Sequence, residues 1–201
     1  MVAQASGGRS GAWSITASTI VLAGIGAALY AVANWTTLHV LVPGTENIDI
    51  RPQYGLVTFF GFAFGPVVGF LVGFVGNTVG DQLSYQNAFG SWWWSVANGL
   101  AGLFCGLAAM LVRPTSSTTT RALIGAIAGL VATIVAFSFI GIEMIIQDFT
   151  LQRILNEEYI PTVIANSAVA LLATPILVLA WEPLREQLRA SSTDPMWTGR
   201  G

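Results

Sequence analysis

The sequence predicts an all-α, polytopic integral membrane protein that folds as a bundle of six transmembrane helices. Apolar residues make up 54% of the 201 residues, and charged residues only 9%. The mean hydropathy is +0.68, and the charged residues lie between long uncharged segments, which is typical of chains that fold in a bilayer. Because a spanning helix needs about 20 residues, this length allows roughly five to seven spans. We expect no separate soluble domain.

Six apolar segments follow one another along the chain, and each is expected to form one helix. The first segment follows Trp13, whose amphipathic ring suits the membrane interface. The predicted helices are residues 15–33, 54–65, 67–80, 93–112, 122–142 and 159–181.

The second and third predicted helices come from one apolar segment that is interrupted at Gly65-Pro66. Pro66 cannot donate a backbone hydrogen bond, and it disfavours helical geometry at the residue before it. A single kinked helix is the alternative, but about 27 residues is long for one span. We therefore predict a hairpin of two helices that carries a polar and aromatic cluster to one face of the membrane.

Arginine placement predicts the orientation of the bundle, because cytoplasmic segments carry an excess of basic residues. With the N-terminus inside, the inner segments hold six arginines and the outer segments only Arg51 and Arg153. Both termini are therefore expected in the cytoplasm, with tails at residues 1–12 and 184–201 flanking a membrane domain at 13–183. The polar and aromatic cluster then faces outward.

The composition excludes several chemistries. All eight basic residues are arginine; without lysine we expect neither a phosphate-binding loop that hydrolyses ATP nor a Schiff-base cofactor. A net charge of −2 with scattered arginines gives no basic patch for nucleic acid. One histidine, His39, and one cysteine, Cys105, are too few for a dedicated metal site, and Cys105 is expected to pack as a small apolar side chain.

The charged residues also bear on energy coupling. Every Asp, Glu and Arg is expected at or beyond the end of a predicted helix. Carriers driven by protons or sodium ions usually keep charged groups or broken helices near the middle of the membrane. A transport subunit without such groups, and without an ATPase motif, would need an external source of energy.

Small residues recur at intervals of four in several predicted helices, a spacing that lets helix backbones approach closely in a bilayer. For most of the glycines, packing inside the monomer is the expected role. In the first helix, Ala23, Ala27 and Ala31 form one stripe, and Gly24 and Ala28 form a second beside it. Spacing alone leaves open whether the alanine stripe packs inside the bundle or receives a helix of another protein.

The connection at residues 41–53 is polar, contains Pro43 and Pro52, and is too long for a tight turn. Connections of this length are often binding loops or lids. A solvated loop is the alternative.

Polar and aromatic residues near the outer helix ends are candidates for binding a small, flat, hydrogen-bonding molecule. Asn77 and Asp81 are one turn apart, and a buried amide at Asn77 needs a partner, either a ligand or another helix. In the triplet at 92–94, Trp94 is the candidate for stacking, because it lies one turn before Asn98. Joining or capping helices is the alternative role for most of these residues. The candidate substrate-binding residues are Tyr54, Asn77, Asp81, Tyr85, Trp94, Asn98, Glu143, Gln147 and Asn166.

Motifs between residues 47 and 102 resemble those of the S components of energy-coupling factor (ECF) vitamin transporters, and the chain is most similar to the riboflavin-type subgroup. The similarity covers the first three or four helices well and the last two only in their layout. The similar segments are Arg51-Pro52-Gln53-Tyr54, Phe64-Gly65-Pro66-Val67-Val68-Gly69-Phe70, Gly73-Phe74-Val75-Gly76-Asn77 followed by Gly80-Asp81, and Ser91-Trp92-Trp93-Trp94-Ser95.

This resemblance implies a six-helix bundle in the bacterial plasma membrane that captures one vitamin with high affinity near its outer face. Riboflavin is the first expectation, and cobalamin or another vitamin the next. The implied partners are a coupling membrane subunit and two ATPase subunits, with the face of Ala23, Ala27 and Ala31 as the docking surface. We expect no cofactor, no metal site and no nucleic-acid partner.

Two other functions stay open at this point. An intramembrane enzyme acting on a lipid or small molecule would need a nucleophile or an acid–base pair in one cavity. Asp81, Glu143 and His39 are the available groups, and no motif links them. A channel or structural subunit would account for the packing glycines but would leave the outer cluster unexplained.

Overall fold

The computed structural model describes residues 13–36, 40–45 and 48–192, with side chains up to residue 188. The described part is all-helical, as predicted. His39 and the residues of both tails at 1–12 and 193–201 lie outside it. Its six long helices are α1 (Ala17–Thr36), α2 (Tyr54–Phe64), α3 (Pro66–Tyr85), α4 (Trp92–Ala109), α5 (Thr118–Phe137) and α8 (Ile160–Ser192).

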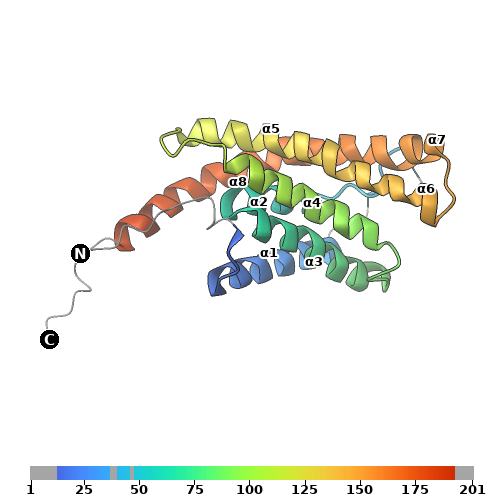
Figure 1. The fold of residues 1–201 in the computed structure, drawn as a ribbon, viewed down its shortest axis with the longest axis horizontal. Coiled ribbons are helices and arrows are strands. Elements are labelled where there is room, and N and C mark those ends of the chain that lie inside the picture. The colour runs from blue at the N-terminus through green and yellow to red at the C-terminus, as the bar shows by residue number, and fades with distance from the viewer. Residues whose placement is uncertain (1–12, 37–39, 46–47, 193–201) are drawn as a thin grey trace, which may run out of the picture.

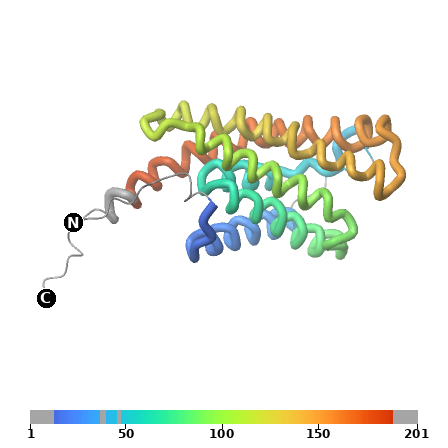
Figure 2. Tube along the Cα trace, in the orientation of Figure 1, coloured from blue at the N-terminus to red at the C-terminus, as the bar shows by residue number. Residues whose placement is uncertain are grey.

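The long helices lie in three pairs (Figure 1). α5 and α8 pack side by side along one side of the molecule, α1 and α3 along the opposite side, and α2 and α4 between them. The last turns of α8 project beyond the rest of the bundle (Figure 2). At the other end of the bundle, α1, α3 and α5 end while α2, α4 and α8 begin. Six helix termini and their connections therefore meet at one end of the fold.

The predicted hairpin is confirmed at Gly65-Pro66. Gly65 adopts a φ of 103°, a conformation that favours glycine because a Cβ would clash with the backbone. Pro66 occupies the first turn of α3, where its missing N–H leaves no helical hydrogen bond unmade. The Gly65 N–H donates to the Gly61 carbonyl oxygen at 2.9 Å and so closes α2.

Glycines bring α3 and α4 into backbone contact. A Cβ added at Gly69 would meet the Gly102 carbonyl oxygen, and one added at Gly102 would meet the Gly69 carbonyl oxygen. Gly73 lies in the same way against the backbone of Asn98. Because lipid supplies no hydrophobic force between helices, this close packing holds the pair together. Intramolecular packing is thus confirmed for these glycines.

The alanine stripe of α1 also packs inside the bundle. Ala23, Ala27 and Ala31 are only 5%, 7% and 2% exposed, and α1 lies against α3. These three residues are therefore not available as a docking surface in this structure, because the chain's own helices already cover them. Gly24 and Ala28, the second stripe, are exposed instead.

Two helices run further than predicted, and they place charged groups inside the bundle. α3 continues to Tyr85, so Asp81 lies within it and is 8% exposed. α8 continues to Ser192, past the tail boundary predicted at residue 184. Within α8, Glu182 is 4% exposed and accepts a hydrogen bond from Arg121 Nε at 3.0 Å. The expectation that every charged residue lies at or beyond a helix end is therefore wrong for Asp81 and Glu182, whose burial is made tolerable by arginine partners.

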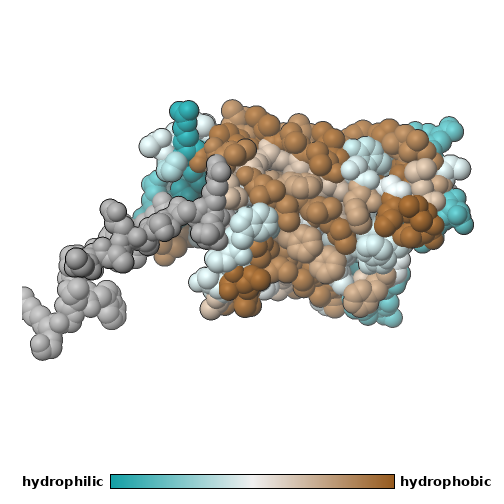
Figure 3. All heavy atoms as spheres, in the orientation of Figure 1, coloured by the Kyte–Doolittle hydropathy of each residue, from teal (hydrophilic) through white to brown (hydrophobic). Residues whose placement is uncertain are grey.

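On the face shown in Figure 3, apolar side chains cover most of the bundle between two ends that carry hydrophilic residues. Large exposed residues include Ile20, Leu123 and Leu172, which are 60%, 61% and 68% exposed. Such a continuous apolar surface suits contact with lipid. Within the described residues, three helical segments are long and apolar enough to cross a membrane: Ala17–Thr36, Thr118–Ile146 and Leu151–Leu188.

Candidate functional site

A cavity of about 770 Å³ lies at the end of the bundle where these six helix termini meet. This volume falls in the range of about 300–1,000 Å³ that is usual for small-molecule sites. Its walls come from the connections before α2 and before α4, from the first turns of α4 and α8, and from the region between α5 and α8. The lining residues are Leu41, Ile48, Asp49, Arg51, Asp81, Tyr85, Asn87, Gly90, Ser91, Trp93, Trp94, Asn98, Phe137, Glu143, Gln147, Phe149, Arg153, Glu157, Glu158, Thr162 and Asn166.

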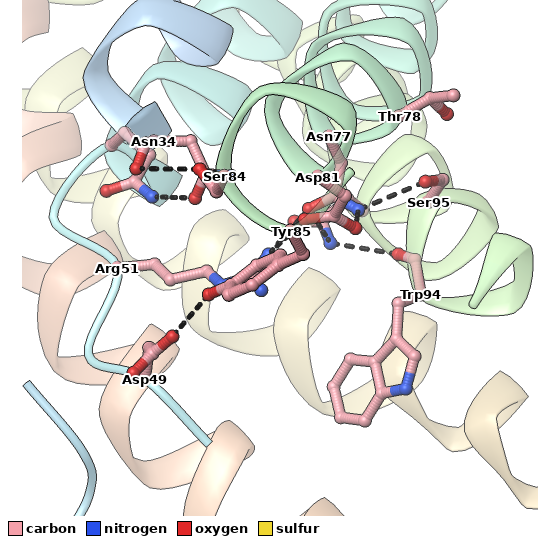
Figure 4. A network of polar contacts seen from close by, with 12 residues as sticks. Asn34, Asp49, Arg51, Asn77, Thr78, Asp81, Ser84, Tyr85, Trp94 and Ser95 are labelled. Atoms are coloured by element: carbon pink, nitrogen blue, oxygen red, sulfur yellow. Dashed lines mark hydrogen bonds and ion pairs between the residues drawn. The ribbon is translucent and has the colours of Figure 1, made fainter. Parts of the chain in front are cut away.

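The floor of the cavity rests on a hydrogen-bonded cluster around Asn77 (Figure 4). Asn77 is fully buried. Its Oδ1 accepts from Arg51 Nη1 at 2.7 Å and from the Tyr30 hydroxyl at 3.2 Å. Its Nδ2 donates to Asp81 Oδ2 at 2.8 Å and to Ser95 Oγ at 3.0 Å. The Asn77 amide therefore joins α1, α3, α4 and the connection before α2, and it does not line the cavity.

Arg51 and Asp81 form the charged part of this floor. Arg51 Nη1 lies 3.7 Å from Asp81 Oδ1, and both residues line the cavity. Beside them, the Tyr85 hydroxyl donates to Asp49 Oδ2 at 2.5 Å, which ties the end of α3 to the connection before α2 (Figure 4).

That connection forms one wall of the cavity. Its two described stretches pair with each other, because Val42 N–H donates to the Ile48 carbonyl at 2.7 Å and Ile50 N–H to the Val40 carbonyl at 2.8 Å. Leu41, Ile48 and Asp49 then face the cavity. This location is the one expected of a binding loop.

A second wall is built around Glu143, which is 3% exposed. Its Oε1 accepts hydrogen bonds from the indole N–H of Trp93 and, at 3.1 Å, from that of Trp94. The Trp94 ring lies 6.0 Å from the ring of Phe137, measured between centroids. Asn98 Nδ2 donates to the Trp94 carbonyl at 2.9 Å. Trp94 and Asn98 therefore share one side of α4, as their spacing predicts.

Irregular helical turns complete this wall. After α5 come a 3₁₀ turn, η2 (Ser138–Ile142), and the single-turn α6 (Glu143–Ile146); then α7 (Leu151–Arg153) and a π-helical turn, η3 (Ile154–Tyr159), lead into α8. Turns that are tighter or wider than an α-helix change the direction of the side chains that follow, and they are frequent at functional sites. Here they bring Glu143, Glu157 and Glu158 to the cavity.

The cavity carries an excess of negative charge, with two arginines in its lining against five carboxyl groups. Arg51 is paired with Asp81. Arg153 lies 3.4 Å from Glu157 and 3.7 Å above the ring of Phe149. Glu143 and Glu158 form no ion pair among the described residues, and the Glu158 carboxyl group instead lies within hydrogen-bonding reach of Glu143.

Several buried polar atoms of the cavity wall have no hydrogen-bond partner within the part of the chain that the structure describes. These atoms are Asn98 Oδ1, Glu143 Oε2, Glu158 Oε2 and Thr162 Oγ1. An unsatisfied buried polar group costs about 1–3 kcal/mol. A ligand that supplies donors at these atoms would recover part of that free energy.

The structure brings most of the predicted site residues together and separates two of them. Tyr54 is fully buried, and its hydroxyl lies 2.8 Å from Thr133 Oγ1, so Tyr54 joins α2 to α5 away from the cavity. Asn77 lies beneath the floor. The predicted residues that line the cavity are Asp81, Tyr85, Trp94, Asn98, Glu143, Gln147 and Asn166.

Sequence reasoning missed four residues that shape the site. Arg51 was counted only as an outer arginine, although it stands in one of the similar motifs. From the sequence, Trp93 cannot be distinguished from a residue of the membrane interface, or Glu158 from the other acidic residues near the helix ends. Thr162 gave no signal, because a threonine in an apolar segment is usually a packing residue. Among the described residues, no group of three or more His, Cys, Asp or Glu side chains is arranged to hold a metal ion.

Comparison with known proteins assigns this fold and cavity to a family. The sequence profile described as "ECF-type riboflavin transporter, S component" matches residues 14–182. This match runs from the residues before α1 into α8 and includes every cavity-lining residue. The chain belongs to this family.

Relatives of this S component are found among streptococcal proteins. A UPF0397 protein of Streptococcus gordonii is 33% identical over 94 residues, which are 47% of this chain and 48% of that protein. A UPF0397 protein of Streptococcus pneumoniae serotype 19F is 31% identical over 103 residues, or 51% of this chain and 53% of that protein. The chain thus spans about half the length of the curated relatives it matches. No solved structure matches it.

The matching family is one of ECF transporter S components, which are substrate-binding subunits of membrane transporters. The apolar surface between two hydrophilic ends agrees with that role.

Proposed function

We propose that this S component captures a vitamin or vitamin-like heterocycle in the 770 Å³ cavity, on the outer face of a bacterial plasma membrane, for ATP-driven uptake by an ECF complex. The cavity itself carries the proposal. Aromatic rings of Trp94, Phe137 and Phe149 offer flat apolar contact, and offset stacking adds about 1 kcal/mol to the burial of a planar ring. Unpartnered acceptors on the same walls fix the orientation of the ligand.

Riboflavin remains the first candidate substrate. It is planar and bears hydrogen-bonding groups along one edge, and the name of the matching family points the same way. The cavity volume suits a ligand of this size. Cobalamin, which has several times the mass of riboflavin, would need an enlarged opening.

Partners supply the energy in this proposal. The chain contains no lysine for a phosphate-binding loop, so a coupling membrane subunit and two ATPase subunits would drive the transport cycle. We assign docking of the coupling subunit to the exposed face of α1 at Gly24 and Ala28, since a Cβ at Gly24 would meet no atom within 4 Å and the alanine stripe beside it is buried.

Binding and uptake test the function directly. Purified chain in lipid nanodiscs should bind riboflavin, or another vitamin from a panel, saturably and in the nanomolar range. Compounds that copurify with the chain can be identified by mass spectrometry. Cells that express the chain with its coupling and ATPase subunits should accumulate the same compound, whereas cells that express the chain alone should not. Absence of saturable binding across the panel, with no copurifying compound, would overturn the proposal.

Cysteine labelling tests the proposed orientation, in which the cavity faces outward and both termini face the cytoplasm. In a Cys105→Ala background, Asn156→Cys lies exposed at the cavity end, and Thr115→Cys lies exposed between α4 and α5. A membrane-impermeant maleimide should label Asn156→Cys in intact cells, and Thr115→Cys only after the cells are broken. The reverse pattern would invert the topology.

A further inference from the structure

We propose that the substrate carries a protonated amine or a similar cationic N–H donor group, and that Glu143 and Glu158 bind it. This inference rests on the proposed function, because it takes the cavity as the substrate site. It narrows the proposed substrate to cationic compounds, a class that excludes the uncharged riboflavin, and it rests on one end of the cavity, formed by α6, η3 and the first turn of α4.

Two carboxyl groups meet at this end without a positive partner. Glu158 lies within hydrogen-bonding reach of Glu143, and the Oε2 atoms of both have no partner among the described residues. Ionised carboxylates only accept hydrogen bonds, and two of them side by side repel each other. A proton shared between them relieves the repulsion. A cationic N–H donor placed there would do the same and would take the place of that proton.

Trp93 and Trp94 determine which carboxylate oxygen of Glu143 is available to a ligand. The indole N–H groups of Trp93 and Trp94 both donate to Oε1 of Glu143. They hold this carboxyl group in one orientation and leave its Oε2 for another donor. Because Glu143 is 97% removed from solvent, with 3% of its surface exposed, water competes weakly and a charge-assisted hydrogen bond is strong.

Asn98 gives an independent indication from a different helix. It is 2% exposed, and its Nδ2 is committed to the Trp94 carbonyl. Its Oδ1 lines the cavity and has no partner within the described chain. Asn98 Oδ1 is therefore a further acceptor that a donor group on the ligand can reach. A ligand with several N–H groups would satisfy this wall, whereas an anionic one would be repelled by it.

The charged neighbours of the pair do not neutralise it. Arg153 and Glu157 are the other charged side chains acting on Glu158, and they form an ion pair with each other at 3.4 Å. Arg153 also lies over the ring of Phe149. The remaining arginine of the lining, Arg51, is held by Asn77 and Asp81 on the floor. Neither arginine of the lining therefore forms an ion pair with Glu143 or Glu158 among the described residues.

A matched pair of ligands isolates the cation. Pyridoxamine and pyridoxine have the same ring and differ in one arm, an aminomethyl group in the first and a hydroxymethyl group in the second. Binding of both, and of riboflavin, would be measured on the full chain in nanodiscs by equilibrium dialysis. We expect pyridoxamine to bind at least about 10-fold more tightly than pyridoxine, as a charge-assisted hydrogen bond implies.

Two Glu→Gln variants, one inside the cavity and one outside it, test whether the preference for pyridoxamine comes from Glu143 and Glu158. Glu158→Gln keeps the shape and removes the charge, so the ratio between the two affinities should fall to within about 3-fold. Glu186→Gln, on an exposed position of α8 outside the cavity lining, should keep the full ratio. Mass spectrometry of the compound that copurifies with the wild-type chain should show a basic nitrogen.

The outcomes separate this inference from the proposed function. Equal binding of the two ligands, or a copurifying compound without a basic nitrogen, overturns the inference alone. Tight riboflavin binding that Glu158→Gln leaves unchanged has the same meaning, because the function then stands without the carboxyl pair. If no ligand binds and nothing copurifies, the proposed function and the inference both fall.

Discussion

Asn77 joins three helices, α1, α3 and α4, and the connection before α2. Its Oδ1 accepts hydrogen bonds from Arg51 and Tyr30, and its Nδ2 donates to Asp81 and Ser95. An amide has donors at one end and an acceptor at the other, so a single residue can hold both an arginine and a carboxylate in place. Arg51 and Asp81, which do line the cavity, are thereby positioned by a residue that does not.

Replacing Asn77 with leucine tests this positioning role. Asn77→Leu has nearly the same size but removes the amide that hydrogen-bonds Tyr30, Arg51, Asp81 and Ser95. The free energy of unfolding should fall by about 2–4 kcal/mol, as expected for loss of a buried polar cluster, and denaturant titration in detergent would measure it.

Tyr30→Phe is the matched control, because it removes only the Tyr30 hydroxyl from the cluster and leaves Asn77 in place. It should cost about 1 kcal/mol. If Asn77→Leu were as mild as Tyr30→Phe while ligand binding disappeared, Asn77 would contact the ligand directly and the positioning role would be refuted.

At the scale of helices, regular packing and irregular turns have different tasks. Gly69, Gly73 and Gly102 let α3 and α4 lie in backbone contact, which fixes the tryptophans of α4 relative to Asp81. The 3₁₀ turn η2 and the π-helical turn η3 depart from α-helical geometry only where α5 and α8 reach the cavity. The close packing of α3 and α4 holds the tryptophans in place, and the irregular turns orient Glu143 and Glu158 toward the cavity.

Gly102→Ala should destabilise the pair of α3 and α4. The added methyl group would overlap the backbone of Gly69, so the helices must move apart at a cost of about 1–3 kcal/mol. Thermal unfolding followed by circular dichroism in detergent would show a lower Tm.

Gly24→Ala makes the same chemical change on the exposed face of α1, where no atom lies within 4 Å. It should leave stability unchanged or raise it by up to about 1 kcal/mol, because alanine has the higher helix propensity. Equal Tm values for the two variants would mean that α3 and α4 do not rely on close approach.

At the scale of the whole molecule, the fold separates the proposed substrate cavity from the proposed docking face for the coupling subunit. The cavity occupies one end of the bundle, while α1 lies along the opposite side from α5 and α8 (Figure 1). One face of α1 is used internally by Ala23, Ala27 and Ala31, and the next face, at Gly24 and Ala28, stays exposed. A partner helix can therefore reach α1 without touching the cavity.

Ala28→Trp should block assembly and spare capture. The bulky ring on the exposed face would prevent close approach of a coupling helix, so the tagged chain should lose its coupling and ATPase subunits on affinity purification and lose uptake. Ligand affinity in nanodiscs should stay within about 3-fold of wild type.

Ala27→Trp is the contrasting change, because Ala27 is buried against the bundle. It should reduce the yield of folded chain and give an aggregated profile on size-exclusion chromatography. If Ala28→Trp assembled normally, docking on this face of α1 would be disproved.

Much of the architecture follows from sequence pattern. In a bilayer each helix makes its own backbone hydrogen bonds, so it can be recognised in the sequence as an apolar segment. The break at Gly65-Pro66 predicts the hairpin correctly, and the glycine spacing correctly predicts close packing inside the monomer, although not which helices pair. The helix ends are less well predicted: Asp81 was placed at a helix end, yet α3 continues past it to Tyr85. Hydropathy does not locate a helix end where a charged residue inside the helix is buried against a partner from elsewhere in the chain, as Asp81 is against Arg51.

The sequence by itself determined the all-helical class, the hairpin, the family and the end of the molecule at which polar and aromatic residues gather. Only the tertiary structure decided that Ala23, Ala27 and Ala31 face inward, that Tyr54 and Asn77 hold helices together, and that Glu158 meets Glu143. The reason is physical. Helix periodicity fixes which residues share a face, but which neighbour covers that face depends on contacts between distant segments. The direction of a side chain on a 3₁₀ or π turn depends on hydrogen bonds that no local pattern records.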